Sequence, residues 1–227
     1  MRIGILQCGH FAKEPGYPEK TYHDLYSDLL AGRGLTFRTW SVVDMEFPET
    51  VQDAEGWLIS GSKHGTYDDL PFIAPLEDFI RQAYAVDVPM VGVCFGHQIM
   101  AQALGGKVEK FSGGWSVGRV DYDFGEETLA LNAWHQDQVV ELPAEATTTA
   151  STDFCAHAAL AYKGKAISIQ PHPEFEPQEI EMLLKARAPG VVPDGIIETA
   201  TANNGKPLDN TLIADRIAAF FKEARNG

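Results

Sequence analysis

The segment Pro89–Gln98 constrains the fold of this chain more than any other part of the sequence. It reads PMVGVCFGHQ, so an apolar stretch runs into Cys94 and a helix-favouring stretch follows at once. Gly92 and Gly96 stand two residues before and two residues after the cysteine. This spacing is typical of a strand–turn–helix elbow, whose turn is so tight that larger flanking side chains would collide. We therefore expect Cys94 at the carboxyl edge of a sheet, where open α/β folds place their sites.

The surroundings of Cys94 predict a nucleophile. A helix that begins directly after a cysteine directs its positive end at the sulfur, which favours thiolate over thiol. The alternative is a buried structural cysteine in a strand, which is the usual role of a lone cysteine. The two flanking glycines and the following helix favour the nucleophile.

A second segment, Gln170–Glu174, supplies the partners that a thiolate nucleophile requires. A nucleophile of this kind needs a proton acceptor, and the acceptor needs a group that orients it. His172 and Glu174 are two residues apart, so in extended backbone their side chains point the same way. Pro171 and Pro173 favour an extended conformation and argue against a helix here. Taken alone, the segment is also compatible with a loop carrying a surface histidine.

The first half of the chain alternates strands with helices, which predicts an α/β fold. The expected strands are Arg2–Cys8, Thr36–Val43, Gly56–Ser60 and Pro89–Val93. The expected helices are Glu19–Ala31, Phe72–Val86 and Gly96–Leu104, with glycines at or near two of their ends. The alternation favours a three-layer sandwich with a mostly parallel central sheet.

In the second half of the chain several short expected strands follow one another, which predicts a small antiparallel β element. Its short expected strands are Lys107–Phe111, Arg119–Tyr122, Gln138–Leu142, Thr148–Ser151, Ala156–Tyr162 and Ala166–Gln170. Two helices, Pro177–Arg187 and Leu208–Ala224, are expected to close the chain. The segment Ala188–Pro207 between them is rich in Pro, Gly, Asn and Thr and is expected to be a surface loop. We expect one domain over residues 1–227, with residues 188–227 as an extension.

Composition excludes several classes of function. The formal net charge of −14 argues against nucleic acid, because phosphate binding needs clustered Lys and Arg. No run approaches the roughly 20 apolar residues that span a bilayer. The three cysteines are widely spaced and odd in number, which argues against a disulfide framework and favours the cytoplasm. The histidines lack ligand-like spacing, so no metal site is expected, and there is no phosphate-binding loop for ATP.

Together, Gly92–Gln98 and Gln170–Glu174 resemble the signature pair of the class I, triad-type glutamine amidotransferase family. The two motifs lie about 80 residues apart and follow the order nucleophile, histidine, glutamate. The segments Trp115-Ser116 and Trp134–Gln138 (WHQDQ) resemble members of the stand-alone, γ-glutamyl hydrolase type. The resemblance implies the flavodoxin-like fold of that family. It also implies that Cys94 forms a γ-glutamyl thioester, that His172 acts as general base and acid, and that Glu174 orients His172.

The residues around Cys94 and the family resemblance together predict which residues form the substrate pocket. Attack on a γ-carboxamide creates an oxyanion, which needs preorganised N–H donors, and the amide of Phe95 directly follows the nucleophile. The resemblance places a second donor at Gly61, in the turn Ser60–Ser62, with Ser62 at the substrate. It also implies substrate contacts for Gln98, Trp115, Ser116 and His135, although a helix-surface glutamine and a structural loop histidine remain alternatives.

The expected activity is hydrolysis of the γ-amide of glutamine or of a γ-glutamyl compound, with a small molecule as the partner and no cofactor. An alternative is a glutaminase subunit that delivers ammonia to a separately encoded synthase. A homodimer is also compatible with the sequence. A third possibility is a non-catalytic regulatory module on the same fold, which the intact Cys–His–Glu set argues against.

Overall fold

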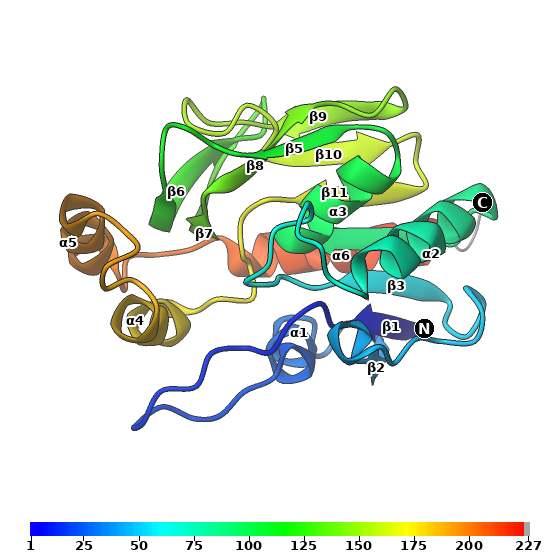
Figure 1. Cartoon of the computed structure of the whole chain (residues 1–227), viewed down its shortest axis with the longest axis horizontal. Helices are drawn as coiled ribbons and strands as arrows, with labels where there is room; N and C mark the ends of the chain where they lie inside the picture. The colour runs from blue at the N-terminus through cyan, green and yellow to red at the C-terminus, as the bar shows by residue number, and fades with distance from the viewer. Residues whose placement is uncertain (225–227) are drawn as a thin grey trace.

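A mostly parallel sheet forms the centre of the molecule in the computed structural model, which describes residues 1–224 (Figure 1). The strand order is β2-β1-β3-β4-β11-β10-β9. Strands β2 to β11 of this order run parallel, whereas β10 and β9 are antiparallel at one edge. The strands are β1 (Arg2–Leu6), β2 (Thr36–Trp40), β3 (Gly56–Ile59), β4 (Met90–Val93), β9 (Ala146–Ala150), β10 (Ala159–Tyr162) and β11 (Ala166–Ile169).

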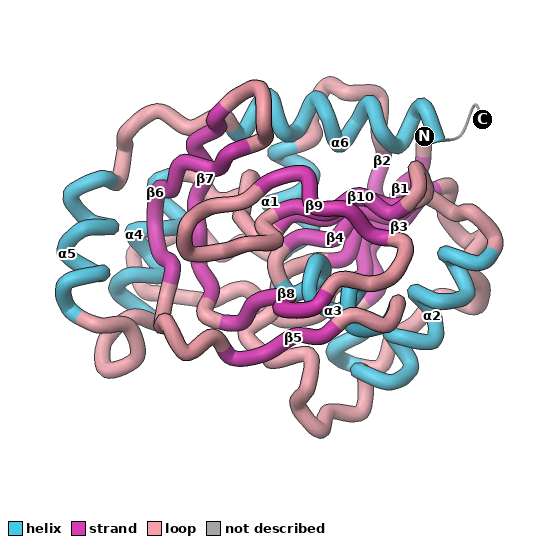
Figure 2. The backbone as a smooth tube through the Cα atoms, turned by 90° about the horizontal axis from the view of Figure 1, so that it is seen from above, coloured by secondary structure: helices cyan, strands magenta, loops and turns pink. Residues whose placement is uncertain are grey.

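Helices cover both faces of this sheet, as Figure 2 shows from above. They are α1 (Tyr22–Leu29), α2 (Ile73–Ala85), α3 (Phe95–Ala103), α4 (Pro177–Ala186), α5 (Asp194–Asn203) and α6 (Asn210–Ala224), besides the short 3-10 helix Val42–Asp44. Helices α1 and α6 contribute to one buried apolar cluster, and α2 and α3 to a second. The two clusters lie on opposite faces of the sheet. Every residue of β3 and β4 is accordingly buried, as expected for strands that are covered on both sides. The predicted three-layer α/β sandwich is therefore confirmed.

The region after α3 departs in part from its prediction. Strand β5 (Lys107–Lys110) pairs with β8 (Asp137–Glu141), and β6 (Ser116–Asp123) pairs with β7 (Thr128–His135), each as a two-stranded antiparallel sheet. The strands β9, β10 and β11 join the central sheet instead. Strand β7 was not predicted, because its sequence TLALNAWH is rich in alanine and carries few β-branched residues.

The prediction of a surface loop over Ala188–Pro207 is wrong for its central part, Asp194–Asn203, which forms α5. This helix packs against β6, where Gly118 leaves room: a Cβ at Gly118 would lie 2.9 Å from the Cβ of Ala200. The helix therefore depends on a tertiary contact that the Pro- and Gly-containing sequence around it does not reveal.

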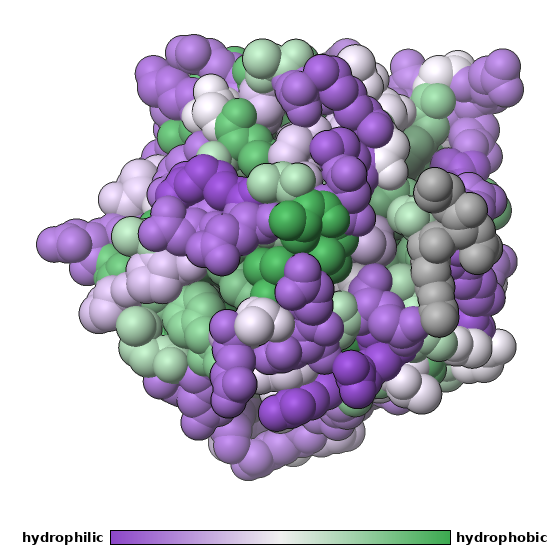
Figure 3. Space-filling view, turned by 90° about the vertical axis from the view of Figure 1, so that its right-hand side faces the viewer, coloured by the Kyte–Doolittle hydropathy of each residue, from purple (hydrophilic) through white to green (hydrophobic). Residues whose placement is uncertain are grey.

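The face that carries both termini is mostly hydrophilic, with a limited apolar patch near its centre (Figure 3). Along the described part of the chain, no helix is long and apolar enough to cross a membrane. The features that concern function lie at the opposite, carboxyl edge of the parallel strands.

Candidate active site

The turn at Cys94 has the geometry that its flanking glycines predict. Cys94 lies between β4 and α3 with φ 52° and ψ −103°, a conformation that residues other than glycine rarely adopt. A Cβ at Gly92 would lie 2.5 Å from the carbonyl oxygen of Gly96, and a Cβ at Gly96 would lie 2.1 Å from that of Ile59. Both glycines are therefore required by close backbone contacts, and the predicted elbow is present.

The structure brings His172 and Glu174 together with Cys94. His172 Nδ1 lies 2.7 Å from Glu174 Oε1, and the imidazole lies close enough to Cys94 for the two side chains to interact electrostatically. All three side chains are buried. Burial by itself would lower the pKa of His172, but the negative charges of Cys94 and Glu174 outweigh it and raise this pKa to about 10. The arrangement thus favours a protonated imidazole at His172.

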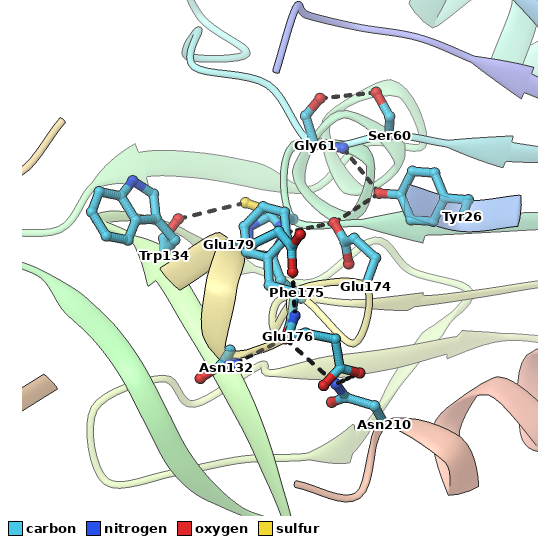
Figure 4. A network of polar contacts seen from close by, with 12 residues as sticks. Tyr26, Ser60, Gly61, Asn132, Trp134, Glu174, Phe175, Glu176, Glu179 and Asn210 are labelled. Atoms are coloured by element: carbon cyan, nitrogen blue, oxygen red, sulfur yellow. Dashed lines mark hydrogen bonds and ion pairs between the residues drawn. The ribbon is translucent and has the colours of Figure 1, made fainter. Parts of the chain in front are cut away.

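The backbone and an aromatic ring fix the position of the His172 imidazole. The His172 N–H donates to the Asn132 carbonyl of β7 at 2.8 Å. The imidazole stacks on Phe175, with ring centroids 4.1 Å apart and planes 5° apart. The Phe175 carbonyl in turn accepts hydrogen bonds from the Asn132 side chain at 2.8 Å and from Asn210 of α6 at 3.4 Å (Figure 4). Strand β7 and the first residue of α6 thus hold the histidine loop.

A tyrosine on α1 connects the carboxylate to the turn that follows β3. The Tyr26 hydroxyl donates to Glu174 Oε1 at 3.1 Å and accepts from the Gly61 N–H at 3.3 Å (Figure 4). Tyr26 is fully buried. The predicted oxyanion donor at Gly61 is therefore already hydrogen-bonded in this structure. Sequence analysis placed Tyr26 on a helix and gave it no role, because nothing local to it indicates a contact with Glu174.

A pocket of about 390 Å³ opens over Cys94 and His172. This volume lies in the usual range for small-molecule sites. Side chains from both halves of the chain line it: His10, Phe11, Ala12, Tyr22, Ser62, Lys63, His64, Gly65, Tyr67, Cys94, Gln98, Lys110, Trp115, Trp134, His135, Gln136, Asp137, His172, Phe175, Leu183, Arg187 and Val191.

Of the predicted substrate-binding residues, four line this pocket and one does not. Ser62, Gln98, Trp115 and His135 contribute to its wall, whereas Ser116, the first residue of β6, is not among the described lining residues.

Two of these four residues, Ser62 and Gln98, have side chains that already form hydrogen bonds within the protein. The Ser62 hydroxyl donates to the Cys8 carbonyl at 2.8 Å. The Gln98 amide group donates to the Asp137 carbonyl at 2.9 Å. Gln98 is buried in α3, so the helix-surface alternative is wrong. Both side chains therefore also maintain the shape of the pocket wall.

His135 is the last residue of β7 and is buried. Burial, together with the smaller effect of nearby His172, lowers its pKa to about 3, so the ring is neutral. Its Nδ1 lies 3.3 Å from the Asp137 carbonyl, whereas its buried Nε2 has no hydrogen-bond partner among the described residues. A buried ring nitrogen without a partner beside a pocket is a candidate contact for a ligand.

Asp137 was not singled out from the sequence. It is the one carboxylate among the described residues that line the pocket. Burial raises its pKa, and the Tyr67 hydroxyl donates to its Oδ2 at 2.9 Å. The WHQDQ motif was the available signal, but only its histidine was selected.

The other two cysteines lie in different surroundings. Cys8 and Cys155 are buried, and burial raises the pKa of Cys8 well above its usual range and that of Cys155 to about 12. Both are therefore protonated at neutral pH. No group of three or more His, Cys, Asp and Glu side chains that could hold a metal ion occurs in the described part of the chain.

Comparison with known proteins identifies the family. The model of the glutamine amidotransferase class-I family matches residues 23–187, a span that contains the elbow and the His172–Glu174 pair. The chain belongs to this family. As a member of the glutamine amidotransferase class-I family it resembles γ-glutamyl peptidase 4 of Arabidopsis thaliana, with 32% identity over 82% of this chain and 80% of that protein.

A second relative is a GMP synthase (glutamine-hydrolyzing) of Yersinia pestis, which is 33% identical over 60% of this chain but only 28% of that protein. Among solved structures, a glutamine amidotransferase from Methylobacillus flagellatus superposes with a TM-score of 0.75 over 99% of this chain and 93% of that one. Because the sequence identity is 21%, this similarity concerns the fold alone. The family resemblance and the fold expected from the sequence are thus confirmed.

Proposed function

We propose that this protein hydrolyses γ-glutamyl amide bonds by itself, with Cys94 as nucleophile, His172 as acid and base, and Glu174 as its orienting group. The observation that carries the proposal is that the buried His172 interacts with both Cys94 and Glu174, and that Cys94 and His172 line the same pocket. The similarity to γ-glutamyl peptidase 4 supports the same activity. Both the geometry of the site and this similarity therefore support hydrolysis of γ-glutamyl compounds.

In the first half of the reaction, the Cys94 sulfur attacks the γ-carbonyl carbon of the substrate. The carbonyl π electrons move to oxygen and form a tetrahedral oxyanion. Protonated His172 then gives its proton to the leaving nitrogen, the C–N bond breaks, and the amine or ammonia departs. A γ-glutamyl thioester remains on Cys94.

In the second half, His172 accepts a proton from a water molecule as the water oxygen attacks the thioester carbon. The C–S bond breaks and the electron pair returns to Cys94 as thiolate, while His172 remains protonated. Glutamate leaves and the starting state is restored. Glu174 keeps the imidazole in one tautomer and orientation throughout, and no electron acceptor is required.

The oxyanion is stabilised by backbone N–H groups on either side of the nucleophile. The Phe95 amide is the first of α3 and has no partner inside the helix. We assign the second donor to the turn Gly61–Ser62, which lies beside the imidazole: a Cβ at Gly61 would be 3.1 Å from His172 Cε1. To donate to the oxyanion, the Gly61 N–H would give up its hydrogen bond to the Tyr26 hydroxyl.

The glutamyl head of the substrate carries an α-ammonium and an α-carboxylate, and the pocket offers groups for both. Asp137 is the carboxylate available for the ammonium. Lys110 is the cross-strand partner of Asp137 between β5 and β8, so it lies beside it and suits the α-carboxylate. The unpartnered Nε2 of His135 is a further contact for this head.

A second candidate function is supply of ammonia to a separate synthase. It is favoured by the 33% identity to a GMP synthase over part of this chain. The cytoplasmic location and the lack of nucleic-acid binding stay predictions from the sequence.

The decisive experiment is glutamate release by the purified protein alone. Steady-state kinetics would compare glutamine with γ-glutamyl dipeptides, and the Cys94→Ala variant would serve as the blank. We expect release from at least one γ-glutamyl dipeptide without any second protein. Silence on every substrate until a synthase is added would favour the ammonia-supplying subunit instead.

A further inference from the structure

The charge of the pocket differs from that of the whole chain. The chain carries a formal net charge of −14, yet Lys63, Lys110 and Arg187 line the pocket against a single carboxylate, Asp137. Throughout residues 1–224 no carboxylate forms an ion pair with any of these three cations, whereas most other Lys and Arg side chains have such a partner. A lining with more cations than anions is complementary to an anionic ligand.

Glutamine does not match this excess, because its head carries one positive and one negative charge. Asp137 and Lys110, which face each other between β8 and β5, already provide one anion and one cation for such a head. The remaining cations therefore suit a ligand with an additional negative charge beyond the glutamyl group.

Arg187 is the cation best placed for that additional charge. It follows the last residue of α4, whereas Lys110 and Asp137 lie on β5 and β8, and the two views show α4 well apart from these strands (Figures 1 and 2). Both nevertheless border the same pocket. An arginine on a different wall can bind a carboxylate at the other end of an extended ligand, and its planar guanidinium suits a bidentate contact.

The wall around Arg187 is apolar. Leu183 on α4 and Val191 in the following loop line the pocket beside it, and Trp115 and Phe11 line it from other segments. The Val191 side chain is 56% exposed, so this part of the wall is accessible to a ligand. An apolar side chain on the ligand would bury this wall.

We propose that the pocket is specific for γ-glutamyl peptides whose amine side is an apolar amino acid with a free carboxylate, and that Arg187 binds this carboxylate. The inference rests on the proposed hydrolysis and names its substrate class. Leu183, Val191 and Trp115 hold the apolar side chain of the departing amino acid, while Asp137 and Lys110 hold the glutamyl head.

The test compares two substrates that differ only in one charge, γ-glutamyl-leucine and γ-glutamyl-leucinamide. For the wild-type protein we expect kcat/KM to be about tenfold higher for the acid, as a charge-assisted hydrogen bond implies. In Arg187→Gln this acid-to-amide ratio falls to about one, and in Arg187→Lys it is partly retained. Because each ratio is measured within one variant, a change in the amount of folded enzyme cancels.

Lys206→Gln is the matched control, since it removes one exposed positive charge whose hydrogen bond goes to Asn203, away from the pocket lining. It should keep the wild-type ratio. A wild-type ratio near one would overturn this inference while leaving γ-glutamyl hydrolysis intact. A preference for the acid that persists in Arg187→Gln would overturn the assignment to Arg187. Failure of the wild-type protein to hydrolyse any γ-glutamyl compound would overturn the proposed function and the inference with it.

Discussion

The Tyr26 hydroxyl donates a hydrogen bond to Glu174 Oε1 at 3.1 Å, although 148 residues separate the two along the chain. The same carboxylate oxygen contacts His172, while Glu174 Oε2 is buried without a partner among the described residues. Tyr26 therefore restricts the rotation of the carboxylate that contacts His172.

Removal of this hydroxyl in Tyr26→Phe should lower kcat roughly tenfold, because a hydrogen bond to a charged group contributes about 1.5–3 kcal/mol. KM should change little, since the Tyr26 side chain does not line the pocket. Tyr122→Phe is the control: Tyr122 is equally buried, but its hydroxyl has no partner in the described structure. Equal losses of kcat in both variants would show that Tyr26 acts only through general packing.

Cys94 should be the only cysteine required for turnover. Cys94→Ala should abolish glutamate release with the fold intact, whereas Cys8→Ala and Cys155→Ala should remain active. The reason is that burial keeps the Cys8 and Cys155 thiols protonated. Peptide mapping after treatment with a glutamine-like chloroketone should find the label on Cys94 alone. Comparable labelling of Cys8 would contradict the assignment.

Glu174 and His172 should differ in how much activity their loss removes. Glu174→Gln should lose rate but retain some acylation, because the amide can still contact the imidazole. His172→Ala should lose nearly all acylation, because among the described residues His172 is the base that interacts with both Cys94 and a carboxylate. Single-turnover acylation rates measure both. A more damaging glutamate variant would reverse the proposed roles.

The raised pKa of His172 should make stability depend on pH. Folding raises this pKa from 6.5 to about 10, so between these values the folded state holds a proton that the unfolded chain has released. The contribution to the free energy of unfolding is full below pH 6.5 and is lost as the pH rises through about 10. Denaturant unfolding of wild-type protein and His172→Ala should therefore differ less as the pH rises. A difference that does not change with pH would contradict the raised pKa.

The sequence predicted the elbow and the histidine loop because each is a local pattern. The residues of Gly92–Gln98 are neighbours along the chain, and so are His172 and Glu174, so their spacing alone indicates how they lie. The central sheet followed from the alternation of buried strands and helices for the same reason.

The parts that were missed depend on contacts between distant segments. Tyr26 reaches Glu174 only because the fold brings α1 beside the turn that follows β3, and nothing near Tyr26 in the sequence reveals this. Helix α5 forms where Ala200 fits against Gly118 of β6. Arg187 is an ordinary residue after a helix until the fold places it at the pocket. Such contacts cannot be inferred from periodicity or composition.

The backbone at Cys94 has a thermodynamic consequence. At φ 52° and ψ −103° a residue with a Cβ is strained by about 1–3 kcal/mol, whereas glycine adopts this conformation without penalty. Cys94→Gly should therefore unfold at a higher temperature than Cys94→Ala, the reverse of the usual order for these two residues. The cysteine that we propose as nucleophile thus occupies a backbone conformation that favours glycine, so its presence in the turn lowers the free energy of unfolding by the cost of that strain.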